Sequence, residues 1–225
     1  MNYLICGKHT VISAYKNNRA KKIYIKNKDD INLFKNIKIE EKELSFFKKN
    51  FELNNIAHQG FAAEVAPIVK YDLNKMILNQ NIKLVALQGI EDQRNIGAII
   101  RSCAAFEVDG VIIENKNFNE SSLLMNKAHA GNIEFVKLIT VSNIINVIKK
   151  LKKNNFTIYC LDKNSNSEIK GYHFDQKSLL IFGNESSGIK NYIKKECDHI
   201  LSIKISKKVE SLNLSNAVAI TLSCL

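Results

Sequence analysis

From residue 82 onward, this 225-residue sequence alternates regularly between short apolar runs and amphipathic stretches. Such apolar runs are typical of strands buried on both faces, and the stretches between them carry apolar residues at helical spacing. The pattern predicts an α/β fold in which a mostly parallel sheet has helices on both faces. The expected strands are 83–87, 110–113, 135–139, 157–161, 179–182 and 200–205, and the expected helices are 96–106, 121–129, 142–153, 189–196 and 214–225.

The amino-terminal part of the sequence has a different pattern and predicts a smaller α/β unit. We expect helices at 8–18 and 41–49 and strands at 22–25, 35–39 and 61–65. Residues 71–81 contain three asparagines and little periodicity, which is typical of a linker. The expected organisation is therefore a domain at 1–70, a linker at 71–81 and a larger domain at 82–225.

The charge of the chain indicates an anionic partner. There are 33 Lys and Arg residues against 22 Asp and Glu residues, a net charge of +11, and nucleic acid is the first candidate for such a surplus. A membrane surface is the rival, but the sequence has no 18-residue apolar run and no apolar signal core near Met1. The five cysteines lie far apart without a C-x-x-C pair, so we expect reduced thiols in a cytoplasmic protein, with neither a disulfide framework nor a zinc site.

Three polar stretches follow or begin predicted elements, and they hold the candidate functional residues. The first, at 92–101, enters a helix and contains Asn95, Gly97 and Arg101. An arginine near a helix start can bind phosphate, although it could equally be an exposed residue paired with Glu91 or Asp92.

The second stretch, at 182–188, leaves a buried strand and has a glycine near each end, so its backbone can approach a ligand closely. Glu185 could orient a proton there, or the stretch could be an ordinary loop. The third, at 209–218, places Ser211 and Asn213 at a helix entrance, where backbone N–H groups favour a polar ligand. A simple helix cap is the alternative.

Taken together and in this order, the three stretches resemble the motifs of the SpoU (TrmH-like) family of RNA 2′-O-ribose methyltransferases, within the SPOUT class. The family pattern D-P-x-N-x-G-A-x-x-R is similar to 92–101, G-x-E-x-x-G to 183–188, and S-L-N-x-S-x-A to 211–217. The spacing of Gly7 and Val11, the turn at 58–60, and the segment from Lys127 to Glu134 are similar to the RlmB-like subgroup.

This resemblance implies a carboxy-terminal trefoil knot, S-adenosylmethionine as the cofactor, a homodimer and no metal. It implies cofactor contacts from Gly183, Asn184, Ile203, Ile205, Ser211 and Leu212. It implies catalytic roles for Arg101, Asn95, Glu185, Ser211 and Asn213. In this interpretation Arg101 grips the target phosphate and stabilises the developing alkoxide, because a guanidinium does not normally act as a base.

The implied activity is 2′-O-methylation of RNA, with a guanosine of large-subunit (23S) ribosomal RNA as the first expectation. The alternatives are a transfer-RNA 2′-O-methyltransferase and a non-catalytic RNA-binding factor for ribosome assembly. Three residues depart from the family pattern: Gln93 and Lys204 replace prolines, and Glu107 replaces a glycine that ends a helix. If residue 107 is left-handed, the substitution costs about 1–2 kcal/mol.

Overall fold

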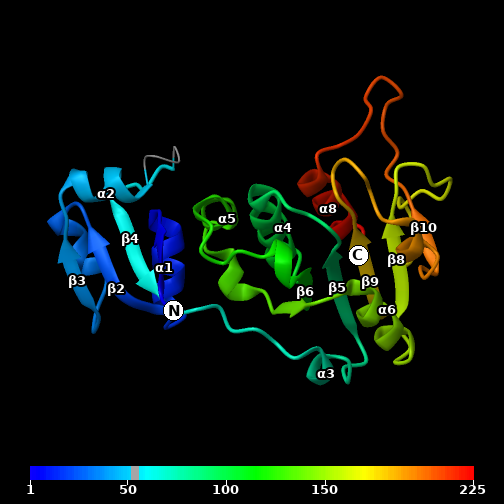
Figure 1. Cartoon of the computed structure of the whole chain (residues 1–225), viewed down its shortest axis with the longest axis horizontal. Coiled ribbons are helices and arrows are strands. Elements are labelled where there is room, and N and C mark those ends of the chain that lie inside the picture. The colour runs from blue at the N-terminus through cyan, green and yellow to red at the C-terminus, as the bar shows by residue number, and fades with distance from the viewer. Residues whose placement is uncertain (52–55) are drawn as a thin grey trace. The chain divides into compact units, whose positions relative to one another are not determined.

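The computed structural model describes residues 1–51 and 56–225, and the chain divides into two compact units (Figure 1). The first unit consists of Met1–Val69 together with Asn119–Phe135, and the second of Lys70–Phe118 and Val136–Leu225. The segment Asn119–Phe135 falls within the range predicted for the larger domain, yet its contacts group it with the amino-terminal residues. The roles that the family resemblance implies, RNA substrate binding for the domain 1–70 and methyl transfer for the domain 82–225, stay predictions.

The first unit is built on a four-stranded mixed sheet in the order β1-β4-β2-β3. Only β2 and β3 run parallel to each other. Buried Ile5, Val11, Ile23 and Ala63 form part of the core between the sheet and α1. Its main elements are β1 (Tyr3–Cys6), α1 (Lys8–Lys16), β2 (Ala20–Ile25), η1 (Lys28–Leu33), β3 (Lys38–Glu41), α2 (Leu44–Phe51), β4 (Phe61–Val65), α5 (Leu123–His129) and η4 (Asn132–Phe135).

A buried ion pair holds the segment Asn119–Phe135 in this unit. Arg19 lies 2.6 Å from Glu134, and both side chains are less than 10% exposed. The Arg19 guanidinium also donates to the hydroxyl of Tyr3. Gly131 packs against α1 so closely that a Cβ atom there would lie 2.6 Å from the Cβ of Ser13. The Lys127-to-Glu134 segment noted in the sequence is therefore part of the first unit's architecture.

The turn at residues 58–60 completes the start of α1. Gly7 precedes this helix and has no side chain to cap it, so the Oε1 atom of Gln59 accepts a hydrogen bond of 3.1 Å from the N–H of Lys8. Gln59 and Gly60 both adopt positive φ angles, which lets the chain reverse directly before β4. The two amino-terminal sequence features, at residues 7–11 and 58–60, thus meet at one helix end.

The second unit contains a six-stranded sheet in the order β10-β8-β9-β5-β6-β7, and every pairing is parallel. This confirms the predicted α/β class. Its elements are α3 (Leu73–Met76), β5 (Ile82–Leu87), α4 (Gln93–Ala105), β6 (Gly110–Glu114), η3 (Asn115–Asn117), β7 (Leu138–Val141), α6 (Ile144–Lys152), β8 (Thr157–Leu161), β9 (Lys177–Phe182), α7 (Asn191–Lys194), β10 (His199–Leu201) and α8 (Leu214–Leu222).

Helices cover both faces of this sheet, as predicted. On one face, Leu84 and Ile181 pack with Ile148 and Leu151 of α6. Their strand neighbours point to the opposite face because side chains alternate along a strand. On that face lie α4 and α8, which pack against each other with Ile99 and other apolar residues buried. The trefoil knot implied by the family resemblance stays a prediction.

Some boundaries differ from those predicted. Strand β7 begins at Leu138 because Phe135 belongs to η4, and β10 ends at Leu201 because the chain turns away to line a pocket. Within the range expected to be a linker, 71–81, α3 buries Leu73 and Met76 in the second unit's core. Strand β1, only four residues long, was not predicted. No helix within the described residues has both the length and the apolar character needed to cross a bilayer.

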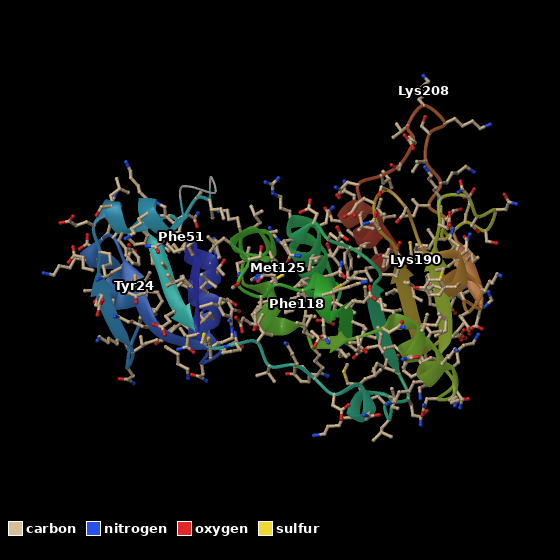
Figure 2. All side chains as sticks on the ribbon, in the orientation of Figure 1. Tyr24, Phe51, Phe118, Met125, Lys190 and Lys208 are labelled. Carbon is tan, nitrogen blue, oxygen red and sulfur yellow. A yellow bond between two sulfur atoms is a disulfide. The ribbon has the colours of Figure 1, made fainter. Side chains whose placement is uncertain are left out.

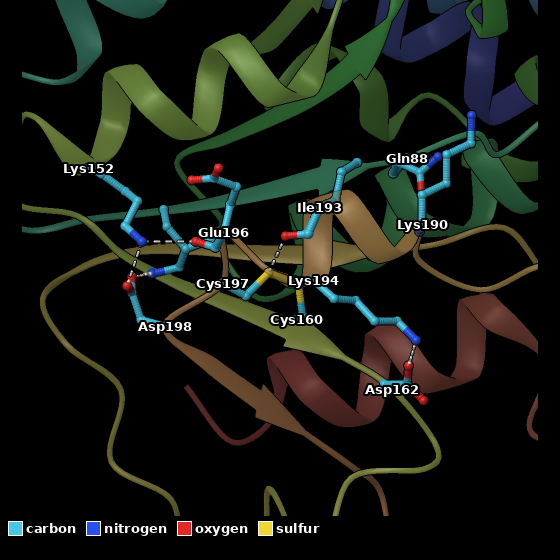
Figure 3. The surroundings of a disulfide bond; sticks show 11 residues. Gln88, Lys152, Cys160, Asp162, Lys190, Ile193, Lys194, Glu196, Cys197 and Asp198 are labelled. Atoms are coloured by element: carbon cyan, nitrogen blue, oxygen red, sulfur yellow. Dashed lines mark hydrogen bonds and ion pairs between the residues drawn. A yellow bond between two sulfur atoms is a disulfide. The ribbon is translucent and has the colours of Figure 1, made fainter.

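The prediction of reduced, unpaired cysteines is wrong for one pair: Cys160 and Cys197 form a disulfide (Figure 3). Cys160 lies in β8, Cys197 lies between α7 and β10, and their Cα atoms are 6.1 Å apart, which is normal disulfide spacing. The 37-residue separation gave no signal in the sequence, since β8 and β10 become neighbours only in the folded sheet. Cys6 and Cys103 are buried thiols, and burial raises the pKa of each to about 12.

Candidate active site

The first motif forms the amino-terminal end of α4. Asp92 caps the helix by accepting a 2.8 Å hydrogen bond from the N–H of Arg94. Gln93 occupies the first helical position, where proline is well tolerated, which explains how it can replace the family proline. Its Nε2 atom donates to the backbone oxygen of Asn117, 2.8 Å away, so the side chain ties the helix start to the loop after β6.

The second motif is a closed loop at the carboxyl end of β9. The backbone of Asn184 bonds to that of Gly188 in both directions, and the Nδ2 atom of Asn184 donates to the Gly89 oxygen at 2.9 Å. Gly183 has no room for a side chain, because a Cβ atom would lie 2.3 Å from the backbone carbon of Gly188. Asn184 and Gly183 therefore shape the loop.

The third motif caps α8 and joins the first two. The Oδ1 atom of Asn213 accepts a 2.9 Å hydrogen bond from the N–H of Ser215, so the predicted helix cap is present. Its Nδ2 atom also lies 3.4 Å from Oδ1 of Asn95. Asn95 in turn donates to Glu185 at 2.7 Å. Residues from all three motifs thus form one chain of hydrogen bonds. Asn213 is a helix cap, and its catalytic role stays a prediction.

A pocket opens beside this chain of hydrogen bonds, at the carboxyl ends of β8, β9 and β10. The pocket has a volume of about 150 Å³. Its wall includes every residue predicted to contact the cofactor: Gly183, Asn184, Ile203, Ile205, Ser211 and Leu212. Glu185 lines it as well. The loop between β10 and α8 that supplies four of these residues extends outward and carries Lys208 at its tip (Figure 2).

The composition of the wall suits a ligand with both an apolar body and polar ends. Leu201, Ile203 and Leu212 supply apolar surface, and the loop at Gly183 offers bare backbone for close approach. These features fit S-adenosylmethionine, whose adenine ring can pack on apolar side chains while its polar groups bond to backbone.

Sequence analysis missed Asp162, which lines the pocket from the end of β8. Its carboxylate pairs with Lys194 of α7 (Figure 3). Partial burial acts to raise the pKa of Asp162, but hydrogen bonds from Lys194 and from the N–H of Asn164 outweigh it and hold the pKa below its ordinary value. A polar residue directly after a predicted parallel strand is a signal that could have identified it.

Of the predicted catalytic residues, Glu185 and Ser211 line the pocket, and Asn95 and Asn213 connect to Glu185 by hydrogen bonds. Arg101 does not line the pocket. It lies six residues after Asn95 on α4, which places it about 120° around the helix and about 9 Å along the axis. It is exposed, and within the described part of the chain it pairs with neither Glu91 nor Asp92. A single copy of the chain thus places Glu185 and Ser211 in the pocket wall, with Asn95 and Asn213 hydrogen-bonded beside it, but without Arg101.

Among residues 1–51 and 56–225, no group of three or more His, Cys, Asp or Glu side chains could hold a metal ion. The parallel sheet, and the pocket at the carboxyl ends of its strands, place this chain in a class of α/β proteins that have a small-molecule site in that position.

Comparison with known proteins gives the family. Residues 83–223 match the SpoU rRNA methylase family, and residues 4–69 match the RNA 2′-O ribose methyltransferase substrate-binding domain. A TrmH-family tRNA/rRNA methyltransferase of Staphylococcus aureus is 32% identical over 173 residues, covering 75% of this chain and 70% of that protein. Its counterpart in Staphylococcus haemolyticus is 30% identical over 230 residues, covering 96% and 92%.

Solved structures agree with the fold. The SpoU methyltransferase AviRb from Streptomyces viridochromogenes, in complex with AdoMet, superimposes with a TM-score of 0.84 at 19% identity, covering 99% of this chain and 88% of that one. The chain belongs to the SpoU rRNA methylase family. It is therefore an RNA methyltransferase, and the methyl donor of this family is S-adenosylmethionine.

Proposed function

We propose that this chain methylates a ribose 2′-hydroxyl of RNA, with a guanosine of large-subunit (23S) ribosomal RNA as the target, in the cytoplasm. The observation that carries the proposal is the convergence of the three motifs: residues of the second and third line one pocket, and residues of all three share one chain of hydrogen bonds. The similarity of residues 1–70 to the RlmB-like subgroup supports a ribosomal target. When bound, S-adenosylmethionine supplies the methyl group.

In this proposal the residues around the pocket bind the cofactor and position the ribose. Gly183, Asn184, Ile203, Ile205, Ser211 and Leu212 hold the cofactor. Glu185 fixes the amide of Asn95, and Asn95 and Asn213 keep the pocket mouth rigid, so that the ribose meets a preorganised surface. Such positioning can contribute about 7–11 kcal/mol to lowering a barrier.

Arg101 completes the site in this proposal, and it comes from a second copy of the chain. Its distance around α4 from Asn95 and its exposure leave it available to a neighbouring molecule. In a symmetric homodimer, the guanidinium grips the target phosphate and stabilises the developing alkoxide beside the other copy's pocket.

Complementation between inactive variants tests this arrangement. Arg101→Ala keeps the pocket but loses the guanidinium, and Leu212→Glu blocks the pocket but keeps Arg101. If Arg101 acts on the other copy, mixing the two variants restores about a quarter of wild-type activity, because random pairing gives half heterodimers with one intact site each. A mixture as inactive as its components would contradict the dimeric site.

Cofactor titration by calorimetry separates the enzyme from a non-catalytic assembly factor. The wild type should bind S-adenosylmethionine, and Gly183→Ala should bind it at least about tenfold more weakly because the new methyl group forces the loop open. Gly171→Ala is the control for backbone strain without a clash, since that glycine has a φ angle of 77° and open space around it. Failure of the wild type to bind would favour the assembly factor.

The transfer-RNA alternative needs a direct comparison. Ribosomal and transfer RNA from cells lacking the protein would be incubated side by side with the enzyme and labelled cofactor. Methylation of the ribosomal RNA at one ribose supports the proposal, and methylation of transfer RNA alone would replace it.

A further inference from the structure

The basic residues of the first unit have different environments in the folded chain, although the sequence shows them as one run. Arg19 is buried against Glu134, and Lys22 lies 2.7 Å from a carboxylate oxygen of Glu40. Each of these two cations is paired with a carboxylate, Arg19 inside the protein and Lys22 at its surface, and so adds little net charge for a partner. The remaining lysines are the ones that can bind an anion.

Four of the remaining lysines surround one groove. Lys16 comes from the end of α1, Lys21 from β2, Lys35 from the segment before β3, and Lys38 from β3 itself; the groove between them has a volume of about 550 Å³. No carboxylate occurs among the described residues that line it. Lys38 lies 3.6 Å from Glu40, whereas Lys16, Lys21 and Lys35 take part in no ion pair within the described chain. We call this surface the lysine groove.

The floor of the lysine groove is rigid. The Tyr15 hydroxyl donates to the Lys35 oxygen at 3.0 Å and accepts from the Lys35 N–H at 2.8 Å. The Tyr15 ring packs edge-on against Phe34, with 5.1 Å between centroids. Lys35 therefore projects from a backbone segment that cannot shift easily. Tyr15 is the one aromatic side chain in the described lining, and these contacts hold it in the wall.

We infer that the lysine groove binds the sugar–phosphate backbone of the RNA substrate without reading its bases. Clustered ammonium groups in a groove whose described lining has no carboxylate attract phosphates, and they carry no sequence information. Stacking of bases needs exposed aromatic rings, which this groove does not offer. The inference rests on the proposed function and deepens it, because it gives the first unit a part in affinity and leaves the choice of nucleotide to other surfaces.

Charge-neutralising variants test the groove. The groove variant combines Lys16→Gln, Lys21→Gln and Lys35→Gln. The matched control combines Lys28→Gln, Lys48→Gln and Lys49→Gln, which removes the same charge from exposed lysines of the same unit. RNA affinity would be measured by fluorescence anisotropy across a salt series, with a substrate RNA and with an RNA of equal length and scrambled sequence.

The groove variant should bind both RNAs at least about tenfold more weakly near physiological salt, and its log–log salt slope should fall by about 2, for three lost contacts of about 0.7 each. The control should change the slope by clearly less. Equal losses in the two variants would overturn the inference, and so would a loss confined to one of the two RNAs.

The experiments distinguish failure of the lysine-groove inference from failure of the proposed methyltransferase function. If the wild type binds RNA and transfers methyl groups while the groove variant binds like the wild type, only the lysine groove is wrong. If the groove variant loses RNA binding but the wild type transfers no methyl group, the enzyme proposal fails and the groove stands. Absence of RNA binding by the wild type would overturn both.

Discussion

The two units of this chain are held together by different kinds of interaction. The first joins two segments that are separated by residues 70–118. Buried polar groups link them, above all Arg19 and Glu134, which expose only 7% and 8% of their side chains. The second relies on a continuous apolar sheet covered by helices and keeps its functional polar groups at the rim of a pocket. Both units have apolar cores, but among the described residues only the first adds a buried long-range ion pair between its two segments.

This difference changes how the first unit should be removed in experiments. Cutting the chain at residue 70 would leave Asn119–Phe135 attached to the second unit without its partners. Glu134 and His129 would then lose the environment that buries them, and Ile133 would be exposed. A simple deletion of residues 1–70 is therefore a poor test of RNA selection, and surface variants such as those in the lysine groove are better suited.

The largest effect is expected from breaking the buried ion pair. Glu134→Ala leaves the Arg19 guanidinium buried without a counter-charge, which should cost about 3–5 kcal/mol of unfolding free energy. Hydrogen exchange should show the loss in the first unit, while cofactor binding by the second persists. The matched control is Glu168→Ala, whose exposed pair with Lys204 should contribute about 0–1 kcal/mol. If both variants lose a similar amount of unfolding free energy, the buried ion pair stabilises the first unit no more than an exposed pair stabilises the second.

The second unit contains a disulfide, and removing it should have the next largest effect on unfolding free energy. Cys197→Ser should lower unfolding free energy by about 2–4 kcal/mol in oxidising buffer, because the 37-residue loop is no longer closed in the unfolded chain. Denaturant unfolding with and without reductant measures this. Cys224→Ser, at a half-exposed free thiol of the same unit, should have little effect. A wild-type stability insensitive to reductant would contradict the prediction.

The sequence predicted much of the second unit for a physical reason. Strands β5, β6, β8 and β9 and helices α4, α6 and α8 follow the apolar period, and in a parallel sheet loops at the carboxyl ends meet at one edge. The motifs around Asn95, Glu185 and Asn213 could therefore be expected to converge, and they do.

Apart from Asp162 and the short strand β1, the features that sequence analysis missed depend on contacts between distant residues. The spacing of 115 residues between Arg19 and Glu134 has no local signature, and neither has the pairing of Cys160 with Cys197. The placement of Arg101 away from the pocket follows from helix geometry, but the motif alone does not show which copy of the chain it serves. Local periodicity reports local structure, and these contacts are not local.

A pH titration offers a smaller test of the first unit. Burial, followed by the nearby Arg19 charge, lowers the pKa of His129 to about 3 from its ordinary 6.5. The unfolded chain therefore binds more protons between these values, so stability is full above about pH 6.5 and falls as the pH drops below it. At pH 5, which is 1.5 units below 6.5, the one additional proton bound by the unfolded chain lowers the unfolding free energy by about 2 kcal/mol. Hydrogen exchange should show this loss at Asn119–Phe135; equal protection at pH 7 and pH 5 would disprove it.

The smallest effect concerns a helix end in the second unit, where the predicted left-handed residue is confirmed. Glu107 has a φ angle of 53°, and the Val108 N–H closes the end of α4 by bonding to the Cys103 oxygen at 2.9 Å. Glu107→Gly should raise unfolding free energy by about 0.5–1 kcal/mol, because relief of left-handed strain exceeds the added entropy of the unfolded chain. Asn155→Gly is the matched control at φ 61°, and it should gain less because asparagine tolerates this conformation. Thermal unfolding of the second unit would rank the two variants, and a destabilised Glu107→Gly would mean that the glutamate makes a contact worth more than the strain it bears.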